Sequence, residues 1–530
     1  MRDAMKSAGS VFPETFALQN GTLGATRTRR WLDSPLVVAA VLLMVGFASR
    51  AVQLGNPVIQ VDDQFYLMVA HRMWEGALPY VDIWDRKPIG LFLIYAAIRL
   101  LGGEGIVQYQ IVATLFAVAT AFVVSRIADR IAPRRGALIA GMAYLLFLGM
   151  FGGDGGQSPV FYNLFVALAA LAIVRIVERP GFDSRTVTLA GTAMLLMGIA
   201  MQIKYTAMFE GAYFGTALMW KAHREGVTLR RVAANAALWL ALAVLPTALA
   251  WGYYSAIGHG DAFYYANFSS IFERSPEPAG LVFGRLLAIA ARISPLALAA
   301  ALSRWPRRIP AGGGQASDSA VHGFVAAWAV AAILGMLAFG SYFDHYALPM
   351  LAPLAIAAAP LLGDFRTGLV TSLRGRTRII PVAFLILAFG GALSARIVDL
   401  NRSRRGDGEE ARAIASFVAP RLQGSCLFVY DGEPILYELT HSCLPTRWPF
   451  PDHLNSWRED HAIGVDSLAE TRRIMASEPR LVISTGAPGE KTNLRTWSYM
   501  QGVLAADYRP AAQWAIGHTE RIVYQRKRGV

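Results

Sequence analysis

Charged side chains and cysteines are both scarce in this sequence. Charged residues make up 16% of the 530 residues and apolar residues 54%, which is too hydrophobic for an ordinary soluble protein of several domains. Two cysteines cannot build a disulfide-rich scaffold. No internal repeat and no nucleotide-binding glycine motif is visible, and the one low-complexity tract is "AGGGQASDSA". The composition predicts a polytopic membrane protein.

Long apolar runs are abundant instead. A helical span needs about 20 apolar residues. Eleven runs bounded by charge, Pro or Gly approach that length, and the shorter ones could instead be re-entrant segments. We therefore expect spans at 36–54, 106–127, 137–151, 159–177, 187–203, 205–220, 232–256, 284–301, 321–340, 347–362 and 379–398.

The Lys and Arg residues predict the orientation of these spans, because basic residues near span ends are retained in the cytoplasm. With residues 1–34 inside, 21 Lys and Arg residues fall in cytoplasmic pieces, whereas the external loops 152–158 and 341–346 hold none. The net charge of +13 then reflects loops that face an anionic lipid surface, and no nucleic acid is needed to explain it. We expect a plasma (inner) membrane protein with a cytoplasmic N-terminus and a transmembrane domain at 35–399.

Residues 400–530 have a different pattern. The amphipathic "GEEARAIASFVAPRL" precedes strand-like "CLFVYDG", "RLVIST", "AAQWAIG" and "RIVYQRK", which predicts a soluble α/β domain of about 130 residues. An odd number of spans places it outside the cell. Cys426 and Cys443 both lie there, which fits a disulfide in an oxidising compartment, although two free buried thiols remain the alternative.

The first external loop, 55–105, is dense in charged and aromatic residues. "DDQFYLMVAHRMWEG" has one apolar face, which predicts an amphipathic helix along the membrane surface, and "KPIGLFLIYAAIRLLGG" predicts a second. The plain interpretation of Asp62 and Asp63 is helix capping. They are accompanied, however, by "PYVDIWDRKP" about 17 residues later, and the combination indicates more than a cap.

This combination resembles the first extracytoplasmic loop of GT-C class glycosyltransferases that use polyprenyl-phosphate sugars, in the group that includes protein O-mannosyltransferases and lipid A aminoarabinose transferases. In that group an acidic pair opens a surface helix and a "G-x-x-P-Y-x-D-x-W-D-x-K-P-P" segment follows. The departures are Asp63 where Glu is usual and Ile89 for the second proline. The matching residues are Asp62, Asp63, Tyr66, Gly76, Pro79, Tyr80, Asp82, Trp84, Asp85, Lys87 and Pro88.

A second similar segment is "SYFDHYALPMLAPLA", residues 341–355. It resembles the "R-Y-x-x-P-x-x-P" segment of the group and places Tyr346 at the tyrosine. His345 replaces the usual Arg. Both residues are candidates for substrate binding.

The resemblance implies a mainly α-helical GT-C-like fold, a polyprenyl-phosphate sugar donor, inversion at the sugar carbon, and Asp62 as general base. A phosphate leaving group needs no protonation near neutral pH, so one base and cations that hold the phosphate would suffice. Asp63 and Asp154 are the other catalytic candidates; Asp154, in "GGDGGQ", is equally a turn residue. Tyr66, Tyr80 and Asp85 are candidate substrate ligands.

Four cations are candidates for holding the phosphate. Lys87 matches the group motif, and Lys204 lies in the turn between two spans, where a snorkelling lysine is the alternative. Arg285 and Arg292 share a helix face inside an apolar run, where a charge indicates function or pairing with an acid such as Glu210.

No cofactor is firmly implied. His259, Asp261 and His345 have no metal-ligand spacing, while the wider GT-C class leaves room for a divalent metal ion. The acceptor is a lipid, glycan or protein of the cell envelope, which the fold alone does not decide. The alternative function is a transporter or flippase of a lipid-linked sugar, against which stand the absence of visible repeats and the acidic external loop.

Overall fold

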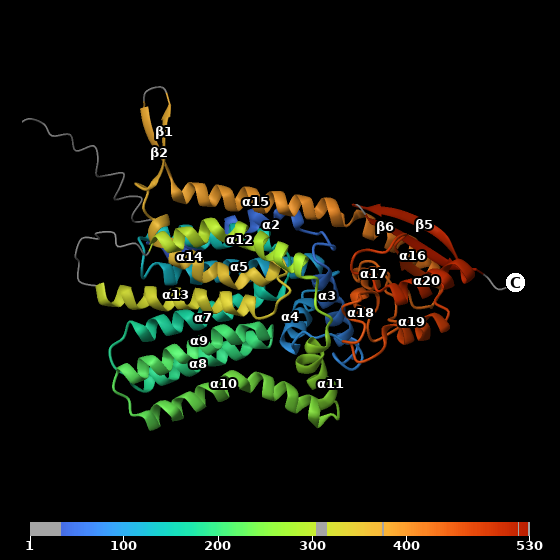
Figure 1. The fold of residues 1–530 in the computed structure, drawn as a ribbon, viewed down its shortest axis with the longest axis horizontal. Helices are drawn as coiled ribbons and strands as arrows, with labels where there is room; N and C mark the ends of the chain where they lie inside the picture. The colour runs from blue at the N-terminus through green and yellow to red at the C-terminus, as the bar shows by residue number, and fades with distance from the viewer. Residues whose placement is uncertain (1–32, 304–314, 374–375, 518, 528–530) are drawn as a thin grey trace, which may run out of the picture.

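A helix bundle and a smaller domain at one end of it make up the structure, a computed structural model that describes residues 33–303, 315–373, 376–517 and 519–527 (Figure 1). Within these residues, ten helical segments are long and apolar enough to cross a membrane. Their helices are α2 (Pro35–Arg50), α5 (Ile106–Ala128), α6 (Arg134–Leu148), α7 (Ser158–Val177), α8 (Ser184–Met201), α10 (Leu229–Ala256), α12 (Ala279–Ser303), α13 (Gln315–Leu337), α14 (Leu348–Leu362) and α15 (Val382–Arg405).

The eleventh expected span corresponds to α9 (Met208–Arg224), which has 17 residues. Each of the eleven apolar runs therefore coincides with one helix of the bundle, and the mainly α-helical membrane fold is confirmed. Helices suit this setting because each satisfies its own backbone hydrogen bonds away from water. Glycine permits close approach: a Cβ on Gly136 of α6 would lie 2.3 Å from the Ala359 carbonyl oxygen of α14.

The first external loop forms α3 (Val61–Trp74) and α4 (Ile89–Arg99). Helix α4 is buried on one face, as expected for a surface helix. Helix α3 differs from the expectation, since every residue from Asp63 to Ala70 is buried. The cause is the C-terminal domain, which covers the outer side of α3: Gln64 Nε2 donates to Glu433 Oε2 over 2.7 Å, and His71 contacts Glu438.

The C-terminal domain contains a four-stranded sheet in the order β3-β4-β6-β5, with β3 parallel to β4 and β6 antiparallel to both of its neighbours. Each of the four segments expected to be strands overlaps one, and the expected amphipathic segment is α16. The elements are α16 (Glu409–Leu422), β3 (Phe428–Val429), α17 (Ile435–Leu439), α18 (Pro451–Asn455), α19 (Ser467–Ala476), β4 (Leu481–Ser484), α20 (Leu494–Asp507), β5 (Tyr508–Ile516) and β6 (Thr519–Arg526).

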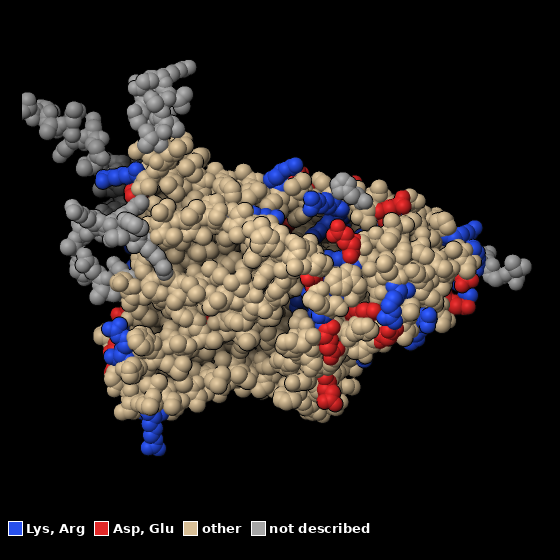
Figure 2. Space-filling model, viewed as in Figure 1, with Lys and Arg blue, Asp and Glu red and all other residues tan. Residues whose placement is uncertain are grey.

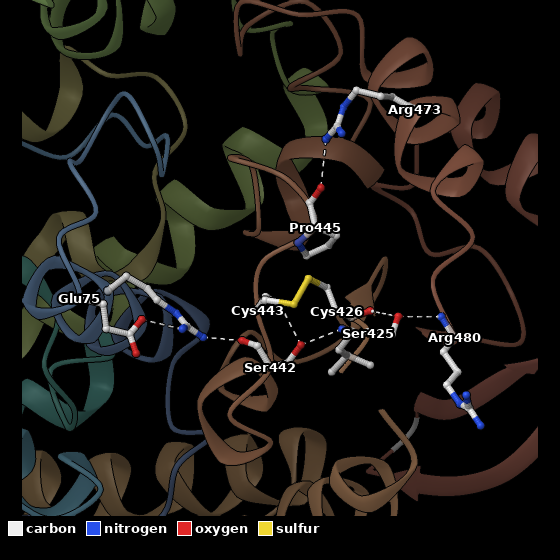
Figure 3. Close-up of a disulfide and its surroundings, with 10 residues drawn as sticks. Glu75, Ser425, Cys426, Ser442, Cys443, Pro445, Arg473 and Arg480 are labelled. Carbon is white, nitrogen blue, oxygen red and sulfur yellow. Dashed lines mark hydrogen bonds and ion pairs between the residues drawn. A yellow bond between two sulfur atoms is a disulfide. The ribbon is translucent and has the colours of Figure 1, made fainter. Parts of the chain in front are cut away.

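A disulfide joins Cys426 to Cys443, with their Cα atoms 4.8 Å apart (Figure 3). The bridge closes a 17-residue separation, which in the chain-entropy account stabilises the domain by roughly 3 kcal/mol. It also anchors the segment that touches α3, because the neighbouring Ser442 accepts a hydrogen bond from Arg72 through its carbonyl oxygen. The disulfide thus stiffens the contact between the domain and the first external loop.

A hairpin of β1 (Gly368–Leu373) and β2 (Arg376–Pro381) projects from the opposite end of the bundle (Figure 1). Residues 363–378 were expected to form a cytoplasmic loop, and the last span was expected to begin at 379. The structure begins α15 at Val382 instead, because the residues before it pair as antiparallel strands.

The orientation makes a testable prediction. Ser184, at the start of α8, and Ser498, in α20, are both exposed, and the two native cysteines are bonded to each other. In intact cells, a membrane-impermeant thiol reagent should label Ser498→Cys and should label Ser184→Cys only after permeabilisation. Labelling of Ser184→Cys in intact cells would overturn the orientation.

Candidate functional site

Asp62 lies at the end of the bundle that carries the C-terminal domain, in the first turn of α3. The helix is preceded by Gln60, and Asp62 is its second residue, so Asp62 does not occupy the capping position. Its carboxylate has side-chain partners instead. Oδ1 lies 3.8 Å from the Lys87 ammonium, and Oδ2 accepts a hydrogen bond of 3.0 Å from Gln157 Nε2.

Lys87 reaches Asp62 from the turn between α3 and α4. The Tyr80 hydroxyl donates to the Lys87 carbonyl oxygen over 2.8 Å, and Tyr80 itself has a φ of 71° in the left-handed region. The ammonium lies 5.1 Å from the centre of the Tyr66 ring, within the range of a cation–π contact. Tyr66 and Tyr80, expected to bind substrate, therefore position Lys87 in this structure.

The electrostatics keep both members of this pair charged. Burial alone would raise the pKa of Asp62, but attraction by Lys87 and neighbouring groups outweighs it and brings the pKa to about 2. Burial likewise works against the charge on Lys87, yet Asp62 and Asp85 raise its pKa above the usual value. Asp85 accepts a hydrogen bond of 2.7 Å from the Arg86 amide, and burial raises the pKa of its carboxyl.

Lys204 supplies a second cation to the same cluster. It follows α8, and its ammonium lies 4.4 Å from the ring centre of Tyr346, whose ring contacts that of His345 at 4.8 Å. Burial, followed by repulsion from Lys87, lowers the pKa of Lys204 to about 7. The structure thus brings Lys204 together with two candidates more than 140 positions later in the chain, His345 and Tyr346.

Asp63 and Asp154 face a different part of the site. Asp63 Oδ2 accepts from the Gly156 amide over 2.6 Å, and a Cβ on Gly155 would lie 2.1 Å from that oxygen. Burial raises the pKa of Asp63 well above its usual value. Asp154 accepts from Gln53 Nε2 over 2.7 Å. The glycine loop (residues 152–157) therefore packs beneath the acidic pair and orients Asp62 through Gln157.

Arg285 and Arg292 of α12 already have anionic partners. Arg285 forms an ion pair with Glu277, and Arg292 Nη1 lies 2.9 Å from Asp344 Oδ1. Pairing with an acid, the alternative for these arginines, is therefore present, but the acid is not Glu210, which accepts a hydrogen bond of 2.7 Å from Trp328 Nε1. A role for the two arginines in phosphate binding stays a prediction, and their charges in this structure are balanced locally.

A group of ion pairs that sequence reasoning missed connects the site to the C-terminal domain. Arg86 Nη2 lies 2.6 Å from Glu459 Oε2, and Glu459 also pairs with Arg274. Arg458 Nη1 lies 2.7 Å from Glu277 Oε1. Only the RKP motif signals Arg86 in the sequence; its partner lies more than 370 positions away. Among the described residues, no group of three His, Cys, Asp or Glu side chains is placed to hold a metal ion.

A protein family model and several solved structures are similar to this chain. The family model for dolichyl-phosphate-mannose-protein mannosyltransferase matches residues 85–251. The apo crystal structure of ArnT from Cupriavidus metallidurans superposes with a TM-score of 0.59 at 14% identity, covering 92% of this chain and 97% of that chain. The structure of the same protein bound to undecaprenyl phosphate gives 0.59 and 16% over the same shares.

Another solved structure is less similar to this chain. An oligosaccharyltransferase from Archaeoglobus fulgidus has a TM-score of 0.49 at 12% identity, covering 85% of this chain and 69% of that chain. No curated protein sequence matches the chain.

The chain therefore has the fold of the GT-C membrane glycosyltransferases, as the resemblance in the first external loop implied. The family model matches less than half of the chain and begins at Asp85, so it covers only the last residues of that loop motif.

The lowered pKa of Lys204 leads to a second prediction. An ammonium with a pKa of about 7 must be protonated to attract a phosphate, so affinity should be constant below about pH 6 and fall as pH rises through 7. The loss approaches about tenfold per pH unit. A polyprenyl methyl phosphodiester is the suitable ligand, because its single charge does not titrate in this range.

The matched control is Lys204→Met, which keeps an apolar stem. Its binding of the phosphodiester should be weaker at pH 6 and nearly independent of pH between 6 and 8. A parent protein that binds equally well at pH 6 and pH 8 would exclude Lys204 as a phosphate ligand.

Proposed function

We propose that the protein is an inverting glycosyltransferase that moves a sugar from a polyprenyl-phosphate donor to an envelope acceptor at the outer face of the plasma membrane. The observation that carries this proposal is the Asp62 carboxylate 3.8 Å from the Lys87 ammonium, with Lys204 beside them, at the junction of bundle and C-terminal domain. Asp62 can take a proton there, and Lys87 and Lys204 can hold a phosphate.

The proposed step is a single displacement. The acceptor hydroxyl loses its proton to Asp62 while its oxygen attacks the anomeric carbon, and the bond between that carbon and the phosphate oxygen breaks with inversion. The electron pair leaves on the polyprenyl phosphate, whose charge Lys87 and Lys204 stabilise. Cations aimed at a developing charge in a poorly hydrated site are effective, because they need no reorganisation during the reaction.

A small cavity of about 20 Å³ lies beside the lysines. Lys204 and Tyr346 line one part of it, and Phe209, Met336 and Phe339 supply apolar surface. The proposal places the polyprenyl chain along this apolar lining while its phosphate meets the lysines, which requires the lining side chains to move apart. The ArnT structure crystallised with undecaprenyl phosphate is a precedent for such a ligand in this fold.

Asp62→Asn tests the general base. The amide keeps the size of the side chain and its contact with Gln157, so folding and phosphodiester binding should be retained, while loss of a positioned base costs roughly 10² to 10⁴ in rate. The measurement is release of free polyprenyl phosphate from donor in the presence of an envelope fraction, which a flippase would not produce. A folded Asp62→Asn protein that turns over at the parent rate would show that another group is the base.

Lys87→Met tests the phosphate cation. The substitution keeps the apolar stem over Tyr66 and removes a charged hydrogen bond worth roughly 1.5 to 3 kcal/mol, so affinity for the phosphodiester should fall about 10- to 150-fold. Arg396→Met is a matched control, since Arg396 is exposed and pairs with Asp399 on the surface of α15. Equal affinity in Lys87→Met and parent would remove Lys87 from the proposal.

A further inference from the structure

The C-terminal domain has a polar cleft of about 770 Å³. Its walls come from the segment after β4, from the start of β6 and from α18. Pockets of about 300 to 1,000 Å³ suit ligands of drug size, so the cleft has room for a few sugar rings. The described residues that line it include neither an aromatic nor a long aliphatic side chain, which makes it a poor seat for an acyl chain.

The charged residues that line the cleft are four acids and two bases. The acids are Asp431, Asp452, Glu490 and Glu520, and the bases are Lys491 and Arg521. An acidic excess repels a phosphorylated or carboxylated ligand. Carboxylates, an amide at Asn455 and threonine hydroxyls can instead accept from and donate to sugar hydroxyls. The lining therefore favours a saccharide without negative charge.

One carboxylate in the cleft is open to a ligand. Asp452 is exposed, and within the described part of the chain no hydrogen bond is made to its side chain. Asp431, in contrast, accepts from the Thr485 hydroxyl over 3.0 Å, which fixes its orientation. Figure 2 shows acidic and basic side chains gathered on the half of the molecule that holds this domain, while the visible flank of the bundle has few.

The cleft is linked to the candidate active site. Desolvation, and to a smaller extent repulsion by carboxylates that include Asp62, raises the pKa of Asp452 to about 6. The Lys491 ammonium lies 5.3 Å from the Phe343 ring, whose neighbour at 5.7 Å is Tyr346. The wall is also tied to α3, since Arg521 pairs with Glu433 at 3.6 Å, and Glu433 bonds to Gln64, two positions after Asp62. These contacts place the wall of the cleft next to residues that surround the candidate base.

We propose that this cleft binds the acceptor, and that the acceptor is the end of an uncharged, polyhydroxylated envelope glycan. The assignment of this ligand as the acceptor rests on the proposed function, whereas binding of a saccharide to the cleft does not depend on catalysis.

Equilibrium binding to the purified full-length protein tests the proposal. The probes are a panel of neutral trisaccharides built from hexose and pentose units, one uronic acid trisaccharide, one Ser- and Thr-rich peptide and one short-chain phospholipid. At least one neutral trisaccharide should bind more tightly than the other three probes. Polyprenyl methyl phosphodiester binding is measured in parallel.

Three variants locate the binding. Ala487 is exposed at the cleft, so Ala487→Trp should fill the cleft and weaken trisaccharide binding at least tenfold. Asp452→Asn should weaken it several-fold. Asp507→Asn, an exposed change on α20 outside the cleft, should leave it unchanged. All three should bind the phosphodiester like the parent.

The two proposals fail in different ways. Three results would overturn the glycan cleft. The first is a protein that binds the phosphodiester but none of the neutral trisaccharides. The others are unchanged trisaccharide binding in Ala487→Trp and tighter binding of the uronic acid, peptide or phospholipid. Loss of phosphodiester binding in the parent protein would instead count against the proposed function and leave the trisaccharide result to stand by itself.

Discussion

The contact between Asp62 and Lys87 is the interaction on which the candidate site depends. Both side chains are about a quarter exposed and their charged atoms lie 3.8 Å apart, so each favours the charged form of the other. The surrounding structure fixes both partners from several directions: Gln157 holds the carboxylate, and Tyr80 holds the backbone of Lys87. The glycine loop packs against Asp63, so α3 cannot rotate without breaking the Gly156 hydrogen bond.

The C-terminal domain belongs to this arrangement as much as the bundle does. It covers α3 through Gln64 and His71, and it pairs with the turn after α3 through Arg86 and Glu459. Such half-buried contacts exclude water from the first external loop, which strengthens the electrostatic interactions there. The disulfide reinforces one edge of the same contact. The loop and the domain therefore form one site rather than a catalytic loop with an appended tail.

The spans and the strands of the domain could be predicted because each follows from a local requirement, the apolar length of a membrane crossing or the pattern of a strand. The Asp62 and Lys87 positions could be identified from a motif. The burial of α3, the glycine loop under Asp63, and the partners of Arg285 and Arg292 could not, because they depend on residues brought together by tertiary packing. The β1–β2 hairpin was missed because most of its residues lie in a basic loop between two expected spans and lack the usual alternation.

The low pKa of Asp62 poses a physical problem for its proposed role, since a carboxylate with a pKa of about 2 is a weak base. The donor itself supplies the remedy. A phosphate that binds to Lys87 and Lys204 draws the lysine charge away from Asp62 and adds negative charge beside it, and both changes raise the pKa of the carboxyl. The base then gains strength only when the leaving group is in place. On the proposed mechanism, the ion pair between Asp62 and Lys87 in the free protein thus makes the basicity of Asp62 depend on the substrate.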